Sequence, residues 1–214
     1  MVTGEGARRA MVQAVERAIG PMAPRFAAAL VAVPRERFVR PEDAWRATDD
    51  MPLPLDDSGH STISAPHAYV LSFELADLSA GDVLLELGSG TGYGAALAAH
   101  VVGPSGRVVT VEIDAALAAR ARALLADLPN VTALHGDAAS PAVGKEGATK
   151  IIVTFAVAEI PEAWLDALPE GGVLVAPVGA PHQVQRLLRV TRKGGALVTT
   201  EHGAVRYVAN RSPG

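Results

Sequence analysis

The chain has 214 residues, of which 49% are hydrophobic, so it contains enough apolar material for a globular core. Its 23 Asp and Glu exceed its 19 Lys and Arg, giving a formal charge of -4, which lacks the basic excess expected of a nucleic-acid-binding protein. Cysteine is missing, which excludes disulfides, thiolate metal sites and a cysteine nucleophile.

The sequence also carries no signal for export or for a membrane. No apolar run reaches the roughly 20 residues that cross a bilayer. The start of the chain, Met1–Glu5, lacks a basic residue followed by an apolar stretch. We therefore expect a cytoplasmic protein with neither nucleic acid nor membrane as a partner. The sequence does not determine the oligomeric state, and a monomer is compatible with it.

The first part of the chain predicts helices followed by a long irregular segment. Apolar residues at helical spacing predict helices over 7–19 and 22–33. Residues 34–66 are rich in proline and predict a loop, which at this length is uncommon inside a domain and is usually functional. A helix is predicted over 66–79, because it opens on a proline, and Ser64 is a candidate cap.

From residue 82 onward, short apolar runs alternate with alanine-rich segments. Strands are predicted over 82–87, 107–113, 131–135, 150–156 and 172–178, with helices over 92–102, 114–128 and 161–168. This alternation is typical of a parallel sheet that is covered on both faces. Two further β-rich runs, 183–191 and 196–208, are joined by Lys193-Gly194-Gly195, which indicates a hairpin and an antiparallel edge.

The predicted fold is therefore α/β, with a doubly wound, mostly parallel, seven-stranded, Rossmann-like sheet. We expect one domain over residues 1–214, because no linker divides the chain. Within it, residues 1–80 would form a helical extension and a loop at the site, and residues 81–214 would form the α/β core.

A glycine-rich loop, Gly88-Ser89-Gly90-Thr91-Gly92, follows the first predicted strand directly. Glycines at this place let backbone N–H groups approach a ligand at the carboxyl edge of the sheet. Acidic residues lie near the ends of successive strands, as Glu86, Glu112 and Asp137. Glu112 can accept hydrogen bonds from both hydroxyls of a ribose, and Asp137 can accept one from an adenine amino group.

The glycine loop alone does not decide between a dinucleotide and S-adenosyl-L-methionine, because Gly90–Ala95 also satisfies the GxGxxA pattern. Three features favour S-adenosyl-L-methionine. Glu86 can bind its ammonium group, Asp137 adds a second acid, and a helical segment precedes the first strand. A sulfonium and an ammonium favour nearby acids, whereas a pyrophosphate does not. No metal is predicted, because Asp56-Asp57 has no further ligands at metal-binding spacing.

The sequence favours a carboxylate as the methyl acceptor. Transfer from a sulfonium is a direct displacement, which needs alignment and a nucleophile in the right protonation state. A carboxylate is already ionised at neutral pH, because its unperturbed pKa is about 4. The stretch Thr154–Glu159 has no polar clamp for an amine, and the missing cysteine excludes covalent activation of a pyrimidine. Methylation of a nucleic-acid base is therefore disfavoured.

Several motifs resemble the protein-L-isoaspartate O-methyltransferase family, most specifically Thr62-Ile63-Ser64-Ala65-Pro66 and Pro177-Val178-Gly179. The other matching motifs are Val33-Pro34-Arg35, Phe38-Val39, Glu86 to Tyr93, Ile152-Val153-Thr154, Glu159-Ile160-Pro161 and Gly171-Gly172. The resemblance implies the fold of a class I methyltransferase that uses S-adenosyl-L-methionine. It also implies an acceptor, the abnormal α-carboxylate of isoaspartyl residues in damaged proteins or peptides, whose methylation starts protein repair.

The resemblance further implies roles for single residues. Ser64 matches the active-site serine of the family, while Glu112 and Asp137 match its acids beside ribose and adenine. The residues expected at the donor are Thr62, Ile63, Ser64, Glu86, Gly88, Ser89, Gly90, Gly92, Glu112, Ile113, Asp137 and Ala138. The residues expected at the acceptor are Leu55, His60 and Val208. We expect the loop over 55–66 to close over both substrates.

The sequence departs from the family pattern near the acceptor. His60-Ser61 stands where the family has Gly-Gln, and Val208-Ala209-Asn210 stands where it has Val-Pro-Leu. A dedicated peptide or a small carboxylic acid therefore stays open as an alternative acceptor. A donor-binding module without catalysis is an alternative from another class. His67 is either a local hydrogen-bond partner or a substrate contact.

Overall fold

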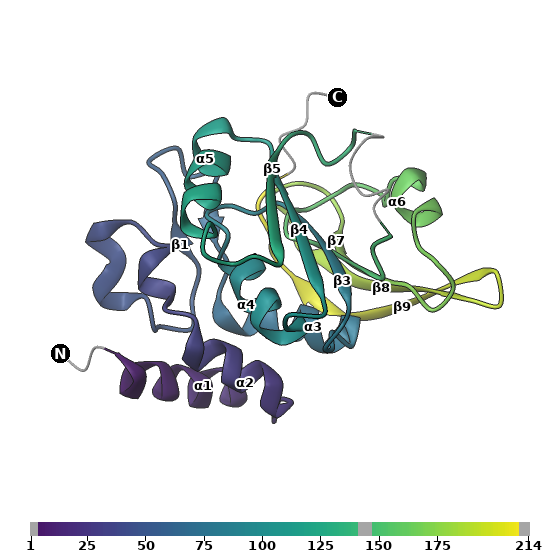
Figure 1. The fold of residues 1–214 in the computed structure, drawn as a ribbon. Helices are drawn as coiled ribbons and strands as arrows, with labels where there is room; N and C mark the ends of the chain where they lie inside the picture. The colour runs from purple at the N-terminus through teal and green to yellow at the C-terminus, as the bar shows by residue number, and fades with distance from the viewer. Residues whose placement is uncertain (1–3, 141–146, 210–214) are drawn as a thin grey trace.

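A computed structural model describes residues 4–140 and 147–209 of the chain, in which a seven-stranded sheet carries helices on both faces (Figure 1). The strands are β3 (Val83–Leu87), β4 (Arg107–Glu112), β5 (Val131–His135), β6 (Lys150–Val153), β7 (Val173–Val178), β8 (Gln185–Lys193) and β9 (Ala196–Val205). Their order across the sheet is β5-β4-β3-β6-β7-β8-β9. The first five are parallel and the last two are antiparallel, so the predicted fold class is confirmed.

The β8–β9 hairpin extends away from the rest of the molecule (Figure 1). Its turn consists of Gly194 and Gly195, with φ angles of 61° and 76°. Two consecutive positive φ angles are what a type I′ turn requires, and glycine adopts them without a steric penalty. The hairpin predicted from these glycines is therefore confirmed.

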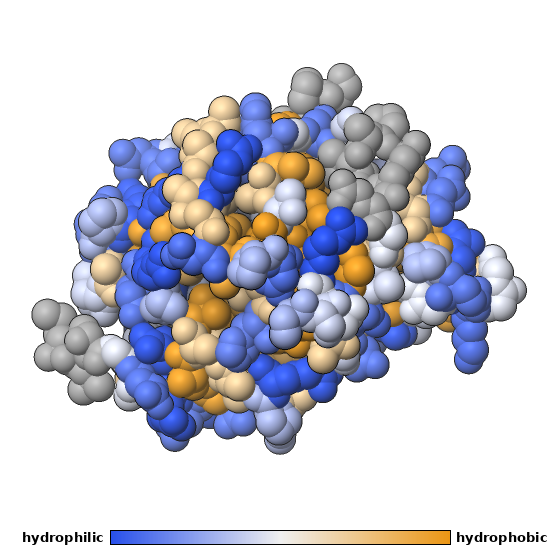
Figure 2. Space-filling model, viewed as in Figure 1, coloured by the Kyte–Doolittle hydropathy of each residue, from blue (hydrophilic) through white to orange (hydrophobic). Residues whose placement is uncertain are grey.

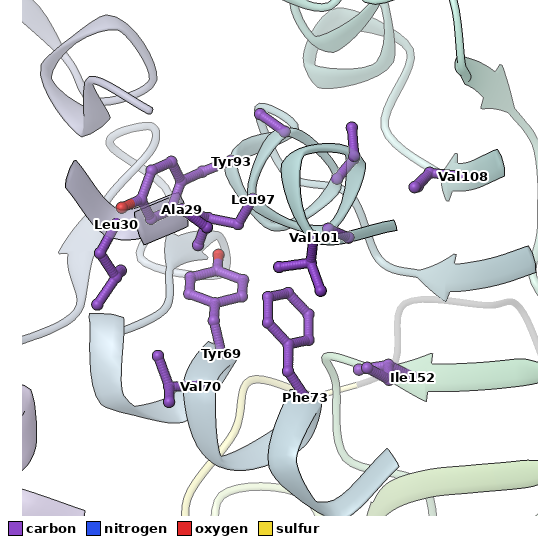
Figure 3. Packing of buried hydrophobic residues seen from close by; sticks show 14 of the residues in the cluster. Ala29, Leu30, Tyr69, Val70, Phe73, Tyr93, Leu97, Val101, Val108 and Ile152 are labelled. Atoms are coloured by element: carbon purple, nitrogen blue, oxygen red, sulfur yellow. The ribbon is translucent and has the colours of Figure 1, made fainter. Parts of the chain in front are cut away.

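The helices are α1 (Glu5–Ile19), α2 (Pro24–Ala32), α3 (Pro66–Ala76), α4 (Tyr93–Val102), α5 (Ala115–Leu124) and α6 (Glu162–Asp166). Successive side chains of each central strand point to opposite faces of the sheet, so each strand contributes to two cores. On β3, Leu84 packs into the core formed with α1 to α5, whereas Leu85 faces the core that includes Trp164 of α6. Figure 3 shows Tyr69 and Phe73 of α3 pointing toward α4, so these helices pack directly against each other.

The segment from 34 to 66 is more ordered than the sequence predicted. It contains the 3₁₀ helices η1 (Arg35–Arg37) and η2 (Pro41–Arg46) and the short strands β1 (Leu53–Pro54) and β2 (Thr62–Ile63). β1 and β2 pair in antiparallel fashion. Strands of two residues are too short to show an alternating pattern, which is why sequence reasoning missed them.

Helix α3 differs from the prediction in its cap and in its carboxyl-terminal boundary. The helix begins at Pro66 as expected, but its N-cap is Ala65, which makes no side-chain hydrogen bond, so the interpretation of Ser64 as a cap is wrong. The carboxylate of Asp50 instead accepts a hydrogen bond of 2.9 Å from the backbone N–H of His67, in the first turn. The helix ends before Asp77, which has a left-handed backbone with φ of 50°.

In the two described ranges, no helix has both the length and the apolar composition needed to cross a membrane. On the side of the molecule shown in Figure 2, hydrophilic residues cover much of the surface, with apolar side chains interspersed among them.

Candidate active site

The candidate site lies at the carboxyl edge of the sheet, where the ends of parallel strands meet a pocket of about 550 Å³, open space at its mouth included. We call it the edge pocket. The predicted residues that line it are Leu55, His60, Thr62, Gly88, Gly90, Glu112, Ile113, Ala138 and Val208. Residues from both halves of the chain therefore meet here, as the sequence predicted.

The glycine loop leaves no room for side chains at the bottom of this pocket. Gly88 has a φ of 97°, and a Cβ there would overlap Oγ1 of Thr154 and lie 2.9 Å from Cδ1 of Phe155. A Cβ at Gly90, where φ is 54°, would lie 2.9 Å from Cδ1 of Leu55. Both the backbone angles and the surroundings therefore require glycine, and the backbone is left open to a ligand.

Glu112 ends β4 beside the loop and is only 5% exposed. Its Oε2 accepts a hydrogen bond of 2.8 Å from the N–H of Gly90, and its Oε1 accepts one of 3.0 Å from the N–H of Asp114. A carboxylate has about four lone-pair sites, so hydroxyl groups of a ligand can bind in addition. The geometry is thus compatible with recognition of a ribose.

Glu86 lies beneath the loop and does not line the edge pocket. Because side chains alternate along β3, Glu86 shares the face of Leu84 and points under the first turn of α4. It is 2% exposed, and the hydroxyl of Thr110 donates a hydrogen bond of 2.5 Å to it. Burial, with a smaller contribution from the nearby charge of Glu112, raises the pKa of Glu86 to about 8. At neutral pH this carboxyl group is therefore mostly protonated.

The carboxylate of Asp137 is engaged locally, where it accepts a hydrogen bond of 2.9 Å from the N–H of Ala139. Its neighbours Gly136 and Ala138 line the edge pocket, whereas Asp137 does not. Three further predicted residues also lie outside the lining. They are Ile63, which is buried in the core, Ser89, whose hydroxyl lies 2.6 Å from that of Thr110, and Gly92, which packs against Leu125.

Ser64 lines a second hollow, which adjoins the edge pocket because Thr62, Thr154 and Val208 line both. We call it the adjacent hollow. The backbone of Ser64 is fixed on two sides. Its N–H donates a hydrogen bond of 3.3 Å to the hydroxyl of Tyr69, and its carbonyl accepts one of 3.0 Å from Arg35. Its side chain is half-buried at the wall of the hollow.

Sequence reasoning missed several residues of the edge pocket. They are Ser61, Val111, Leu117, Gly136, Thr154, Phe155 and Ala209. Thr154 follows β6 at the carboxyl edge, so the rule that identified Glu112 could have found it. Leu117 carries no such signal, because an apolar residue in the first turn of a helix usually belongs to the core. Asn210, where the sequence departs from the family, lies outside the described residues.

A model of the protein-L-isoaspartate(D-aspartate) O-methyltransferase family matches residues 8–212, nearly the whole chain. The chain belongs to this family. Two relatives named protein-L-isoaspartate O-methyltransferase support this membership. The protein of Methanothermobacter thermautotrophicus is 40% identical over 166 residues, which are 77% of this chain and 76% of the relative. The protein of Ignicoccus hospitalis is 43% identical over 168 residues, which are 78% of this chain and 79% of the relative.

Two solved structures share the fold of this family member. One, described as a protein-L-isoaspartate O-methyltransferase, is 29% identical with a TM-score of 0.84, and the match covers 94% of this chain and 65% of that chain. The second is from Plasmodium falciparum and is described as a complex with S-adenosyl-L-homocysteine. It is 20% identical with a TM-score of 0.82 over 96% of this chain and 99% of that chain.

Proposed function

We propose that this chain transfers a methyl group from S-adenosyl-L-methionine to the α-carboxylate of L-isoaspartyl residues in damaged proteins or peptides. Membership of the family supports this function. The observation that carries the proposal is the arrangement of the site. The edge pocket, with Glu112 and the glycine loop, adjoins the hollow that Ser64 lines, and the two share wall residues. A donor and an acceptor can therefore meet between them.

The lining of the edge pocket fits the nucleoside part of the donor. Gly88 and Gly90 leave the backbone accessible, and Glu112 offers lone pairs to ribose hydroxyls. Apolar side chains of Ile113 and Leu117 supply a surface for a flat ring. When bound, the donor supplies an electrophilic methyl group on a sulfonium.

The residues near the acceptor would orient it and exclude water. An acceptor carboxylate is ionised at neutral pH and needs no general base. We assign Ser64 the role of orienting this carboxylate through its hydroxyl, without a covalent step. Leu55 lies against Gly90 at the loop, and together with Thr62 it lines the pocket. Exclusion of water strengthens the polar contacts to the reacting groups.

The role proposed for Glu86 follows from its buried position. Its contact with Thr110, whose hydroxyl lies 2.6 Å from that of Ser89, supports the glycine loop from below. We therefore propose that Glu86 shapes the donor site through the loop.

We also propose that the chain works in the cytoplasm on isoaspartyl proteins. The lack of cysteine agrees with this reducing compartment.

A pair of peptides that differ only at one residue tests the function. Peptides of one sequence, with isoaspartate or normal aspartate at a single position, are incubated with the protein and donor labelled in its methyl group. We expect label on the isoaspartyl peptide alone, as a base-labile ester. Equal labelling of both peptides, or of neither, would contradict the proposal. Transfer only to a small carboxylic acid would support the alternative acceptor, and donor binding without any transfer would support the non-catalytic module.

The Ser64→Ala variant extends this assay to the mechanism. We expect its turnover of the isoaspartyl peptide to fall by roughly ten- to a thousandfold, because the acceptor loses an orienting hydrogen bond. Donor affinity should stay the same, since Ser64 does not line the edge pocket. Unchanged turnover would remove Ser64 from the mechanism.

A further inference from the structure

A histidine–carboxylate pair stands at the wall of the adjacent hollow and has no part in the function described so far. Nδ1 of His67 lies 3.0 Å from each carboxylate oxygen of Asp50. Asp50 also accepts the backbone N–H of His67 at 2.9 Å. The side chain of Asp50 is 12% exposed and that of His67 is 39% exposed, so the carboxylate is buried behind a partly accessible ring.

This pairing determines which nitrogen of His67 remains available. An ionised carboxylate only accepts hydrogen bonds, so the proton of the neutral ring resides on Nδ1. Nε2 then carries a free lone pair. Among residues 4–140 and 147–209, the structure gives Nε2 no hydrogen-bond partner. The ring belongs to the lining of the hollow, together with Ser64.

The charges around the hollow suit an acceptor that carries a carboxylate. Arg206 lines it and is exposed, so a positive charge stands at its rim. In the part of the chain that the structure describes, no Asp or Glu belongs to its lining. An anionic peptide that enters the hollow therefore meets the positive charge of Arg206, while the carboxylate of Asp50 lies behind the ring of His67.

We propose that His67 binds the acceptor peptide, with Asp50 fixing the ring so that Nε2 accepts a hydrogen bond from a backbone N–H of the peptide beside Ser64. This inference rests on the proposed function, because it takes the adjacent hollow as the acceptor site. It goes further in assigning the contact with the peptide backbone to a side chain outside the edge pocket.

A structural role makes a different prediction for the same residue. If His67 only anchored the start of α3, its backbone N–H and Nδ1 would serve that purpose and Nε2 would be dispensable. Two variants separate these roles. His67→Asn keeps an N–H group near the position of Nδ1 for Asp50 but has nothing at the position of Nε2. His67→Gln carries its amide farther out, near the former Nε2.

The test measures steady-state kinetics with the isoaspartyl peptide, and equilibrium binding of that peptide to protein saturated with S-adenosyl-L-homocysteine. For His67→Asn we expect KM and Kd for the peptide to rise roughly three- to tenfold, the size of one lost hydrogen bond. The KM for the donor, kcat and the melting temperature should stay the same. His67→Gln should recover part of the peptide affinity.

Unchanged peptide KM and Kd in His67→Asn would overturn the inference. A parallel loss of peptide affinity, donor affinity and melting temperature in both variants would also overturn it, in favour of the structural role. If the unaltered chain binds and methylates the isoaspartyl peptide, and both variants have the same peptide KM and Kd as the unaltered chain, only the assignment of His67 fails. If the unaltered chain neither binds nor methylates that peptide, the proposed function fails as well.

Discussion

Glu86 shows how the position of one residue changes its chemistry. The sequence predicts a charged partner for the donor at this position, because Glu86 lies just ahead of the glycine loop. The alternation of side chains along β3 instead turns it under α4, where a Cβ at Gly94 would overlap its carboxyl group. Loss of water around the group favours its neutral form and raises the pKa of Glu86 to about 8.

The raised pKa of Glu86 predicts a pH dependence of stability. Below its ordinary value of 4.5 the group is protonated in both folded and unfolded states and has no effect. As pH rises toward about 8, only the unfolded state ionises, so the free energy of unfolding falls, by at most about 1.4 kcal/mol per pH unit. Glu86→Gln cannot ionise but keeps an acceptor for Thr110, so it should lack this decline.

Urea unfolding of both proteins at pH 5.5 and pH 8.5 measures this effect. We expect the variant to gain stability relative to the unaltered chain as the pH rises between these values. Other titrating groups are common to both proteins, so their contributions cancel in the difference. A stability difference that is the same at both pH values would contradict the burial-driven pKa.

At the scale of elements, Arg35 ties η1 to the segment that carries the site. It is 0% exposed, and its guanidinium donates hydrogen bonds to the carbonyls of Ala47, Asp49, Met51 and Ser64, at 2.8 to 3.2 Å. These carbonyls come from both sides of the β1–β2 pair. One buried side chain thus holds a proline-rich segment in a single arrangement next to α3.

Removal of this guanidinium is expected to destabilise the fold. Arg35→Met keeps much of the volume but leaves buried carbonyls without a donor, and each such group costs about 1–3 kcal/mol. We therefore expect the free energy of unfolding to fall by roughly 3–5 kcal/mol. Arg35→Lys keeps a charge with fewer donors and should lose less. Chemical denaturation measures both variants, and a Met variant as stable as the unaltered chain would contradict the role of Arg35.

Elements with a long repeating pattern could be predicted from sequence, and irregular ones could not. The parallel strands and the glycine hairpin were found because alternation and turn residues are local signals. The β1–β2 pair depends on Arg35 and on burial of Leu53, which are tertiary contacts. Glu112 could be expected at the pocket because it ends a strand of the parallel sheet, whereas Asp137, whose carboxylate accepts a hydrogen bond from the N–H of Ala139, lies outside the pocket lining.

At the scale of the whole molecule, the sheet brings residues that are distant in sequence to one edge. The segment before α3 supplies Thr62 and Ser64, the loop after β3 supplies Gly90, the end of β4 supplies Glu112, and the end of the described chain supplies Val208. The edge pocket and the adjacent hollow therefore depend on the complete fold. Glu112 both accepts a hydrogen bond from the glycine loop and lines the edge pocket, so the proposed donor contact can be tested at this residue.

Donor binding at Glu112 and the glycine loop can be measured by calorimetric titration of S-adenosyl-L-homocysteine into the unaltered chain and into Glu112→Gln. A hydrogen bond to a charged group contributes about 1.5–3 kcal/mol, so we expect the substitution to weaken binding by roughly ten- to a hundredfold or more. A thermal unfolding curve for the variant controls for loss of the fold. We expect S-adenosyl-L-homocysteine to bind to the unaltered chain, and to bind more weakly or not at all to a variant that is still folded. Equal affinity of the two proteins would contradict the role of Glu112, and no binding to the unaltered chain would contradict the edge pocket as the donor site.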